Sequence, residues 1–333
     1  MERHIMSALD NIFSQSGIEY ENKMSDLTVL SMGLGQDSTT ILFKIAFDPD
    51  FKAQYAPKKL LVLFSDTGNE HPFTYQYRDE VIIPFCKAHR IEFVTISSDM
   101  GYHTKGWKSL THKWSYGNRP TIGSVAYPKS CTHQLKLMPQ YNFLEEWIIK
   151  EYDLPQSVCK RAFVYFAKYF GKIRWLVGIA KGEESRVQDA EAETLLWKKQ
   201  SVVIEYPLLG VGMDRSACQA YIKSLGFQLP MPSNCMFCPY GSNHLELLWL
   251  YHSYPDRFNE WVQLEQNKLD AWSDTDVKNL GVCGKLHKDG ERKGQAVTLL
   301  DVLEEAKAKY PNMQLEDLQE YKWSHGHCVA SKY

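Results

Sequence analysis

The sequence predicts an α/β protein built on a parallel sheet with helices on both faces, followed by a mostly helical C-terminal part. Three observations lead to this prediction. Short, continuously apolar runs typical of buried strands alternate with helical patterns from Leu27 onward. Several of these runs are followed directly by glycine-containing or polar turns. The composition, 44% hydrophobic and 23% charged, is that of a globular protein.

The elements expected in the first two thirds of the chain are strands separated by helices. Strands are predicted at 27–30, 60–64, 91–96 and 175–179, and helices at 41–46 and 74–88. Past residue 205 the pattern is more helical, with helices expected at 213–225, 245–268 and 299–310 and either Asp214 or Ser216 as the cap of the first. We therefore divide the chain into an N-terminal arm (1–26), a nucleotide-binding domain (27–210) and a helical region (211–333).

The bulk numbers exclude some classes of protein. The net charge of −2 over 333 residues gives no strong overall attraction to nucleic acid. No apolar run reaches the ~18 residues that a membrane span needs, and the N-terminus leads into no signal-peptide core. The expected location is therefore the cytoplasm, where the eight cysteines serve as core thiols, metal ligands or redox groups rather than disulfides.

One polar segment combines basic side chains with aromatic rings. Basic side chains alternate there with aromatic ones, a composition that suits a nucleic-acid strand because bases stack on rings and phosphates pair with cations. The other interpretation is a solvated surface loop. The residues concerned are Lys105, Trp107, Lys108, Lys113, Trp114, Tyr116 and Arg119.

The most informative stretch is Ser-Met-Gly-Leu-Gly-Gln-Asp-Ser-Thr-Thr at residues 31–40. It joins the first strand to the first helix, and unpaired amides and the dipole at a helix N-terminus favour a phosphate. Gly33 and Gly35 are expected to take positive φ and to let a ligand approach the backbone. Hydroxyl groups come from Ser31, Ser38 and Thr39, while Asp37 either begins the helix or approaches a phosphate-bound cation. An ordinary strand–turn–helix corner is the alternative.

Two well-known phosphate loops do not fit this stretch. A Walker loop ends in Gly-Lys-Ser/Thr, and no lysine is present here. A dinucleotide fingerprint requires a third glycine where Ser38 stands. The loop instead resembles the PP-loop of ATP pyrophosphatases.

The resemblance extends to four further segments in the same order. They are similar to motifs of the phosphoadenosine phosphosulfate reductase-like branch of the PP-loop superfamily, and together they span about residues 27–265. The segments are 64–72 (FSDTGNEHP), 129–139 (KSCTHQLKLMP), 178–186 (GIAKGEESR) and 233–240 (SNCMFCPY).

Membership would imply an adenine nucleotide alpha hydrolase-like fold with a parallel sheet of five or more strands. Such a protein binds ATP with Mg²⁺ and cleaves it between the α- and β-phosphates. The resemblance assigns ATP binding to Ser31, Gly33, Gly35, Gln36, Asp37, Ser38, Thr39, Asp66 and Gly178. The candidate catalytic residues are Asp37, Lys136 and Arg186, because cations stabilise charge that develops on phosphate oxygens. Against these roles, Arg186 is equally suited to pair with Glu183 or Asp189 on a surface turn, and Lys136 to be solvated.

Cys235 and Cys238 form a C-x-x-C pair that is suited to hold a metal or a cluster. Cys131 is expected to join them, and three thiolates would hold an iron–sulfur cluster with one open iron. Cys283 is the candidate fourth ligand, which would close the cluster or make a zinc site. Free or catalytic thiols are a further alternative. Three other cysteines fall in helix-like patterns and are expected to be buried small hydrophobes: Cys86, Cys159 and Cys218.

The predicted function is an ATP pyrophosphatase that adenylates a DNA backbone phosphate for sulfur incorporation, as in DNA phosphorothioation proteins of the DndC/SspD type. Its partners would be a cysteine desulfurase and other subunits of a modification system. One alternative is a tRNA thiolase. Another is a sulfonucleotide reductase with a reducing partner, for which Cys283 and Cys328 give partial matches to the required cysteine motif. A third is a non-catalytic ATP-binding subunit of a defence complex.

Overall fold

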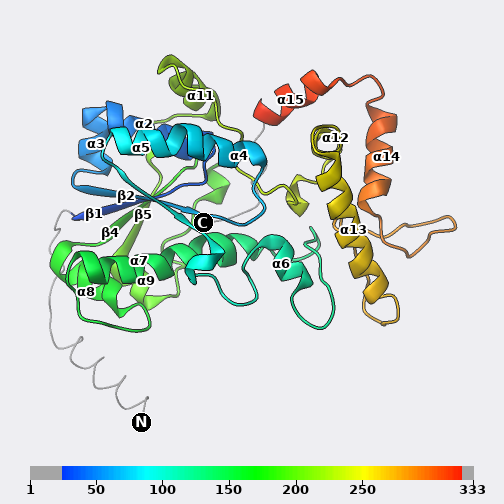
Figure 1. Cartoon of the computed structure of the whole chain (residues 1–333), viewed down its shortest axis with the longest axis horizontal. Helices are drawn as coiled ribbons and strands as arrows, with labels where there is room; N and C mark the ends of the chain where they lie inside the picture. Colours follow the sequence, from blue (N-terminus) through cyan, green and yellow to red (C-terminus); the bar gives the residue numbers. More distant parts are fainter. Residues whose placement is uncertain (1–24, 325–333) are drawn as a thin grey trace, which may run out of the picture.

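The computed structural model describes residues 25–324, so the predicted arm at 1–26 falls almost wholly outside it. Its centre is one sheet of five parallel strands in the order β3-β2-β1-β4-β5 (Figure 1). The strands are β1 (Leu27–Ser31), β2 (Lys59–Ser65), β3 (Glu92–Ile96), β4 (Ile173–Val177) and β5 (Val202–Glu205). The predicted α/β class and parallel sheet are confirmed. The strand order reverses between β1 and β4, and ligands of open α/β sheets bind at such a point.

Helices cover both faces of the sheet, as predicted (Figure 1). One layer contains α2 (Gln36–Phe47), α3 (Pro49–Tyr55), α5 (Ile83–Ala88) and α11 (Arg215–Ser224). The other contains α7 (Met138–Glu151), α8 (Arg161–Phe170) and α9 (Leu196–Ser201). No helix within residues 25–324 has both the length and the apolar character needed to cross a bilayer.

The two layers are attached through the alternation of side chains along the strands. In β1, Leu27 and Val29 face one core, whereas Leu30 faces the other. In β4, Trp175 packs on the face covered by α7 and α8, and Leu176 packs on the face of α2. A strand that is apolar on both faces reads as a continuous apolar run, which explains why the sequence located these strands well.

Some predicted boundaries are wrong for local reasons. The helix expected over 245–268 is two helices, α12 (His244–Ser253) and α13 (Pro255–Ala271). Pro255 disfavours helical geometry at the preceding residue, and Tyr254 adopts φ −141° and ψ 64°. The helix expected over 74–88 is continuous in space but contains a π-helical turn between α4 (Pro72–Tyr77) and α5.

Asp214 caps α11 by accepting a hydrogen bond from the amide of Ala217 at 2.8 Å. Of the two predicted alternatives, Asp214 and Ser216, the first is therefore the N-cap. This helix packs on α2, and its Cys218 and Ile222 belong to the core of the sheet. Chain from Met231 onward builds a separate apolar core, which α12, α13, α14 (Leu299–Lys309) and α15 (Leu315–Ser324) share with α6 (Leu110–Ser115). This second core lies beyond the carboxyl ends of the strands (Figure 1).

A buried ion pair holds the last described helix, α15, to the rest of this second core. The Lys322 side chain is 0% exposed, and its Nζ donates to Glu246 Oε2 at 2.7 Å and to Asn234 Oδ1 at 3.1 Å. The ammonium also lies 4.8 Å from the centre of the Trp249 ring. One residue later, the Trp323 carbonyl accepts from Gln36 Nε2 at 3.1 Å. The ion pair therefore fixes both the 234 segment and a contact to the start of α2.

We expect Lys322→Met to destabilise the protein by about 3–5 kcal/mol, because it leaves the Glu246 carboxylate buried without its cation. The matched control is Lys307→Met, whose exposed pair with Glu304 contributes about 0–1 kcal/mol. Urea denaturation followed by circular dichroism measures both. Equal stability of the two variants would show that the buried pair has no such role.

Candidate nucleotide-binding site

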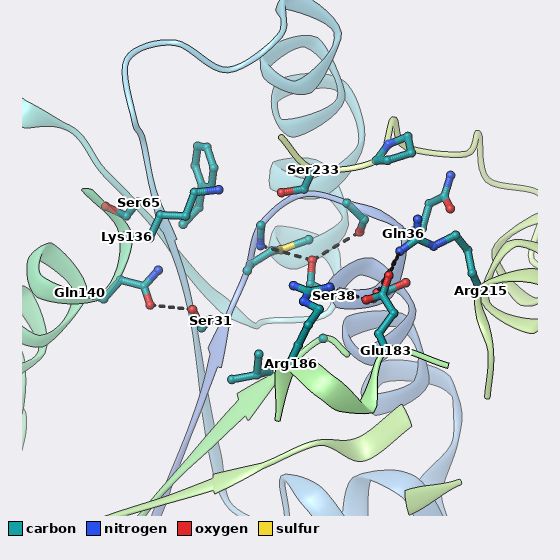
Figure 2. Close-up of a pocket in the computed structure, with 18 residues that line it drawn as sticks. Ser31, Gln36, Ser38, Ser65, Lys136, Gln140, Glu183, Arg186, Arg215 and Ser233 are labelled. Atoms are coloured by element: carbon teal, nitrogen blue, oxygen red, sulfur yellow. Dashed lines mark hydrogen bonds and ion pairs between the residues drawn. The ribbon is translucent and has the colours of Figure 1, made fainter. Parts of the chain in front are cut away.

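A cavity opens at the carboxyl ends of β1, β2 and β4, at the point where the strand order reverses (Figure 2). Its floor is the loop from Ser31 to Ser38, and its walls come from segments far apart in sequence. The segments contribute Phe64 and Ser65 from β2, Lys136 and Gln140 from around the start of α7, Val177 and Gly178 after β4, Glu183 and Arg186, Arg215, and Pro232 and Ser233. Loops that are far apart in the sequence thus converge on one cavity at the strand ends.

Hydrogen bonds between residues close in sequence hold the loop in place. Gly35 is the N-cap of α2, and its carbonyl accepts from Thr39 N–H at 3.1 Å and from Ser38 Oγ at 3.3 Å. The amide of Gly33 donates to Ser38 Oγ at 3.3 Å. The amides of residues 36–38 precede the first intrahelical bond, so they are available to an anion at the helix N-terminus.

The expectation that Gly33 and Gly35 take positive φ is wrong. The left-handed residue is Leu34, at φ 58°, and Gly35 has φ −93°. The two glycines are required for a different reason, which is close packing. A Cβ on Gly33 would lie 2.8 Å from Ser233 Oγ, and a Cβ on Gly35 would lie 2.9 Å from the Ser233 amide nitrogen.

Gly178 approaches the same loop from β4. A Cβ on this residue would lie 2.7 Å from the Ser38 amide nitrogen and 3.1 Å from the Asp37 side chain. Glycine is therefore needed where β4 meets the N-terminus of α2, because any side chain would displace an amide that faces the cavity. The predicted ATP-binding residues Gly33, Gly35 and Gly178 all line the cavity.

Cations and carboxylates meet on one wall of the cavity. Arg186, only 7% exposed, pairs with Glu183, which also pairs with Arg215 Nη2 at 2.5 Å. Arg215 Nη2 lies 3.9 Å from Asp37 Oδ2. The pairing of Arg186 with Glu183 is thus present, but in a buried cavity wall rather than on a surface turn. The arrangement positions two guanidinium groups beside the loop amides (Figure 2).

Asp37 is the residue whose chemistry the cavity changes most. Burial raises its pKa to about 6, and Glu183 acts in the same direction, while Arg215, Arg186 and the Ala180 backbone amide oppose them. Its Oδ1 is buried and accepts no hydrogen bond from the described residues. A buried carboxylate oxygen without a donor, beside the amides at the N-terminus of α2, fits a hard cation such as Mg²⁺, which is commonly bound by one carboxylate and substrate phosphates.

Two predicted ATP-binding residues lie outside the cavity lining. Thr39 is fully buried in α2. Asp66 instead organises the turn after β2, where its Oδ1 accepts from the Gly68 amide at 2.8 Å and from the Tyr75 hydroxyl at 2.7 Å. Ser31, Gln36 and Ser38 do line it. Ser31 Oγ donates to Gln140 Oε1 at 2.9 Å, whereas the Gln36 amide group is directed to the Pro230 and Trp323 carbonyls.

Several lining residues were not predicted, above all Arg215, Gln140 and Ser233. Arg215 follows the Asp214 cap of α11, and a cation in the first turn of a helix is unfavourable to the helix dipole. That placement is a signal that sequence reading could have used. Ser233 stands in the quoted 233–240 segment, but only the packing against Gly33 and Gly35 reveals its position.

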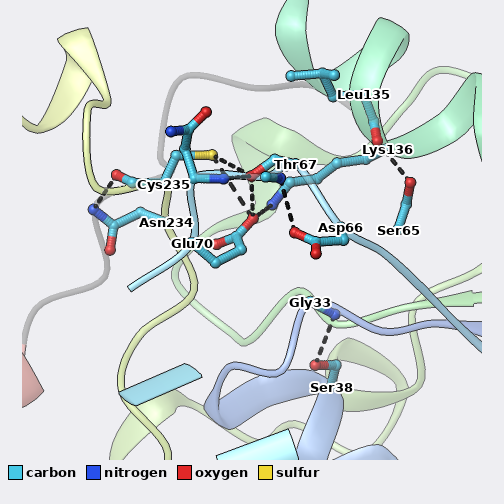
Figure 3. Close-up of polar contacts among 12 residues, drawn as sticks. Gly33, Ser38, Ser65, Asp66, Thr67, Glu70, Leu135, Lys136, Asn234 and Cys235 are labelled. Carbon is cyan, nitrogen blue, oxygen red and sulfur yellow. Dashed lines mark hydrogen bonds and ion pairs between the residues drawn. The ribbon is translucent and has the colours of Figure 1, made fainter. Parts of the chain in front are cut away.

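Lys136 lies between the cavity and the cysteines (Figure 3). Its Nζ is 3.6 Å from Glu70 Oε1, and its side chain is 15% exposed. The same Glu70 oxygen accepts from Thr67 Oγ1 at 3.0 Å and lies 3.7 Å from Cys235 Sγ. Lys136 is therefore held by an ion pair rather than solvated, and Glu70 connects it to the C-x-x-C segment.

The structure brings three of the candidate metal ligands into one neighbourhood. Burial raises the thiol pKa of Cys235, and the nearby Glu70 and Cys238 raise it further. Burial also raises the pKa of Tyr240, and Cys131 and Cys238 act on it in the same direction. Within residues 25–324, however, no three His, Cys, Asp or Glu side chains are placed to bind one metal ion. The iron–sulfur or zinc site stays a prediction, and we derive no chemical step through it.

The remaining cysteines differ from one another in environment. Cys283 is buried in the second core, where desolvation and Glu265 raise its pKa to about 12. Cys86 and Cys218 are buried in helices as predicted, but Cys159 is exposed and has φ 58° in a loop before α8, so its predicted burial is wrong. Cys328 lies outside the described residues.

Comparison with known proteins gives little beyond the fold. No protein-family model matches the chain, and no curated protein matches it. Among solved structures it is similar to the U34-tRNA thiolase NcsA from Methanococcus maripaludis with its 4Fe–4S cluster, at 12% identity over 95% of this chain and 82% of that one. The TM-score is 0.37. A structural likeness with this identity and TM-score carries no function over to this chain.

We expect Gly178→Ala to weaken ATP binding at least about tenfold, because its Cβ would displace the Ser38 amide from the cavity. Isothermal titration with ATP and Mg²⁺ measures the affinity. Gly241→Ala is the matched control, since its Cβ would meet no atom closer than 3.7 Å. Unchanged ATP affinity in a folded Gly178→Ala variant would contradict the placement of the phosphates.

In EDTA and without nucleotide, we expect Asp37→Asn to be more stable than the parent protein at pH 8, by about 1–3 kcal/mol. Because the folded-state pKa of about 6 lies above the unfolded value of 3.8, the ionised carboxylate destabilises the fold above pH 6. The advantage of Asp37→Asn should shrink as the pH falls below 6 and vanish near pH 4. Thermal denaturation across this pH range measures it.

Asp48→Asn serves as the control of opposite sign. The Phe51 amide and Lys44 lower the pKa of Asp48, so its ionised form stabilises the fold and the substitution should reduce stability at pH 8. A pH-independent effect of Asp37→Asn would show that burial of its charge is not the cause.

Proposed function

We propose that this chain is an ATP pyrophosphatase that adenylates an acceptor for sulfur incorporation and releases AMP. The observation that carries the proposal is the cavity at the strand-order reversal, in which the N-terminal amides of α2, Arg186, Arg215 and an unpartnered Asp37 oxygen converge. A neutral sugar or an apolar ligand would leave these charged and polar groups without partners, whereas a polyphosphate with its cation would pair with all of them.

The reaction follows from this placement. The loop amides hold the β,γ-phosphates, and Asp37 with phosphate oxygens would hold Mg²⁺, which offsets the phosphate charge and favours attack at the α-phosphorus. An acceptor oxygen then bonds to that phosphorus while the α–β bridging bond breaks and pyrophosphate leaves with its electron pair. Arg186 and Lys136 stabilise the charge that develops on the phosphate oxygens.

Sulfur enters in the second step. A hydrosulfide ion attacks the atom that carries the adenylated oxygen, that carbon–oxygen or phosphorus–oxygen bond breaks, and AMP leaves with the electron pair. No electrons are gained or lost when the donor is at the sulfide level. A persulfide from a cysteine desulfurase would need an additional thiol as reductant.

The acceptor that we propose is a nucleic acid. The sequence favours a DNA backbone phosphate, as in phosphorothioation systems. A base of RNA, as in a tRNA thiolase, is the second candidate. It is favoured by a ring-sized aromatic cavity beside Cys131, described in the next subsection. A sulfonucleotide reductase is less well supported, because the buried Cys283 thiol with a pKa of about 12 is a poor nucleophile at neutral pH.

The products of ATP test this proposal. With α-labelled ATP, Mg²⁺ and RNA or DNA oligonucleotides, we expect AMP and pyrophosphate, and thiolated nucleotides by mass spectrometry once sulfide is added. Arg186→Met should lower kcat about 10²–10³-fold, because it removes a transition-state contact. Arg257→Met, at an exposed ion pair with Glu260, is the matched control.

ADP and inorganic phosphate as products would overturn the proposal. Tight ATP binding without any turnover in the presence of acceptor and sulfide would instead indicate the non-catalytic subunit. The thiolated nucleotide decides between DNA phosphate and RNA base.

A further inference from the structure

We propose that a second cavity, on the far side of Cys131 from the ATP site, binds one unstacked nucleobase of a single-stranded RNA loop. The cavity measures about 230 Å³ and is lined mainly by rings and apolar side chains. A cavity of roughly 150 Å³ accepts benzene, so this one has room for a single base and no more than that. The inference rests on the proposed function and takes its second candidate, an RNA base, as the acceptor.

The walls of this cavity are well ordered by packing and hydrogen bonds. Trp114 is 4% exposed and packs on Phe237 of the second core. Gly123 lies so close to Pro239 and Trp114 that a Cβ would be 2.7 Å from one and 3.0 Å from the other. The Tyr240 hydroxyl donates to the Tyr127 carbonyl at 2.7 Å. The cavity is therefore present before any ligand arrives.

Lysines flank the aromatic lining in positions suited to phosphates. Lys113 Nζ lies 5.4 Å from the centre of the Trp107 ring, and Lys129 Nζ lies 5.3 Å from that of Tyr240. Tyr127 is 52% exposed at the rim, where a second base can stack on it. Rings that hold bases beside cations that hold the backbone are the usual means of binding a single strand.

The charge of the surrounding chain supports the same occupant. Residues 100–144 contain no Asp or Glu, although the whole chain has 40 acidic residues against 38 basic ones. The segment carries the basic residues Lys105, Lys108, Lys113, Arg119, Lys129 and Lys136. Arg119 pairs with the exposed Asp274, and Lys136 faces Glu70. In a protein of net charge −2, this acid-free segment is a local site for a polyanion.

The position of the cavity connects it to ATP chemistry. Cys131 lines the base cavity, and Lys136 lines the ATP cavity. Cys131 is the N-cap of the π-helical segment Thr132–Leu137 that contains Lys136, so about one helical turn separates the two residues. Figure 1 shows this part of the chain around α6, between α7 and α13. A strand bound here would present its bases next to the reactive phosphate.

RNA loops fit this cavity better than duplex DNA does. Bases in RNA loops are already unstacked, whereas a base in a duplex must first be extruded at a cost of a few kcal/mol. The few cations of the segment add only modestly to the binding free energy through contacts with the phosphate backbone of the nucleic acid. The cost of extrusion favours an unpaired strand, and we commit to single-stranded RNA because sequence-specific RNA recognition targets the unstacked bases of loops.

Fluorescence anisotropy tests this inference without ATP, so the outcome is independent of pyrophosphatase activity. The probes are a labelled RNA hairpin whose loop contains all four bases, the corresponding DNA hairpin and a fully paired RNA duplex. We expect the RNA hairpin to bind more tightly than either of the other two. Removing one loop base at a time should reveal a single position whose loss weakens binding about 5- to 150-fold, the range for one stacked base.

Substitutions assign the binding to the cavity. Tyr127→Ala and Trp107→Ala should each weaken RNA binding by a similar factor and abolish the dependence on that loop base. Tyr169→Ala is the matched control, since Tyr169 is 58% exposed and has Lys168 over its ring but belongs to α8. Lys113→Gln should reduce the salt dependence of binding by about one ion. Unchanged thermal melting and ATP affinity verify that the variants fold.

The inference fails if Tyr127→Ala and Trp107→Ala bind RNA as the parent does, if no loop base matters, or if the DNA hairpin binds more tightly. Base-dependent RNA binding together with absent AMP release would keep the base cavity and overturn the proposed function. AMP release together with RNA binding that the cavity substitutions do not change would keep the proposed function and overturn the base cavity.

Discussion

The close approach of three backbone segments at the start of α2 is the constraint on which the rest of the site depends. Gly178 follows β4, the loop with Gly33 and Gly35 follows β1, and Ser233 lies in the segment that leads into the second core. None of the glycines can gain a side chain without moving a neighbour by several tenths of an ångström. Because an interior packed to this density deforms little, the loop amides stay aimed at the cavity before a ligand binds.

Charge in the cavity follows from the same packing. Burial of Asp37 beside Glu183 is electrostatically unfavourable, and Arg186 and Arg215 offset only part of it. Such unfavourable burial is typical of sites that acquire their remaining partner with the ligand. The second core contributes through the Lys322–Glu246 pair, because Lys322 also holds Asn234, the residue that follows Ser233. Elements far from the loop amides therefore decide the shape of the site.

The base cavity and the ATP cavity are also products of one arrangement. The helical turn between Cys131 and Lys136 separates them, and Glu70 and Thr67 link the lysine to Cys235. Cysteines, phosphate-binding loop and aromatic lining thus meet at one edge of the sheet. This proximity suits the two-step reaction that we propose, since an intermediate formed at one cavity would not have to leave to meet its next reactant.

The sequence by itself determined the parallel sheet and located the glycine-containing loop between its first strand and helix, because buried parallel strands are continuously apolar and a glycine turn before a helix is a local signal. It did not determine why Gly33 and Gly35 are glycine, that Thr39 and Asp66 stand outside the cavity, or that Arg215 and Ser233 stand inside it. These facts depend on contacts across as many as 200 positions, such as that between Gly33 and Ser233. Only the tertiary structure decides such contacts, because local propensity carries no information on which distant segments pack together.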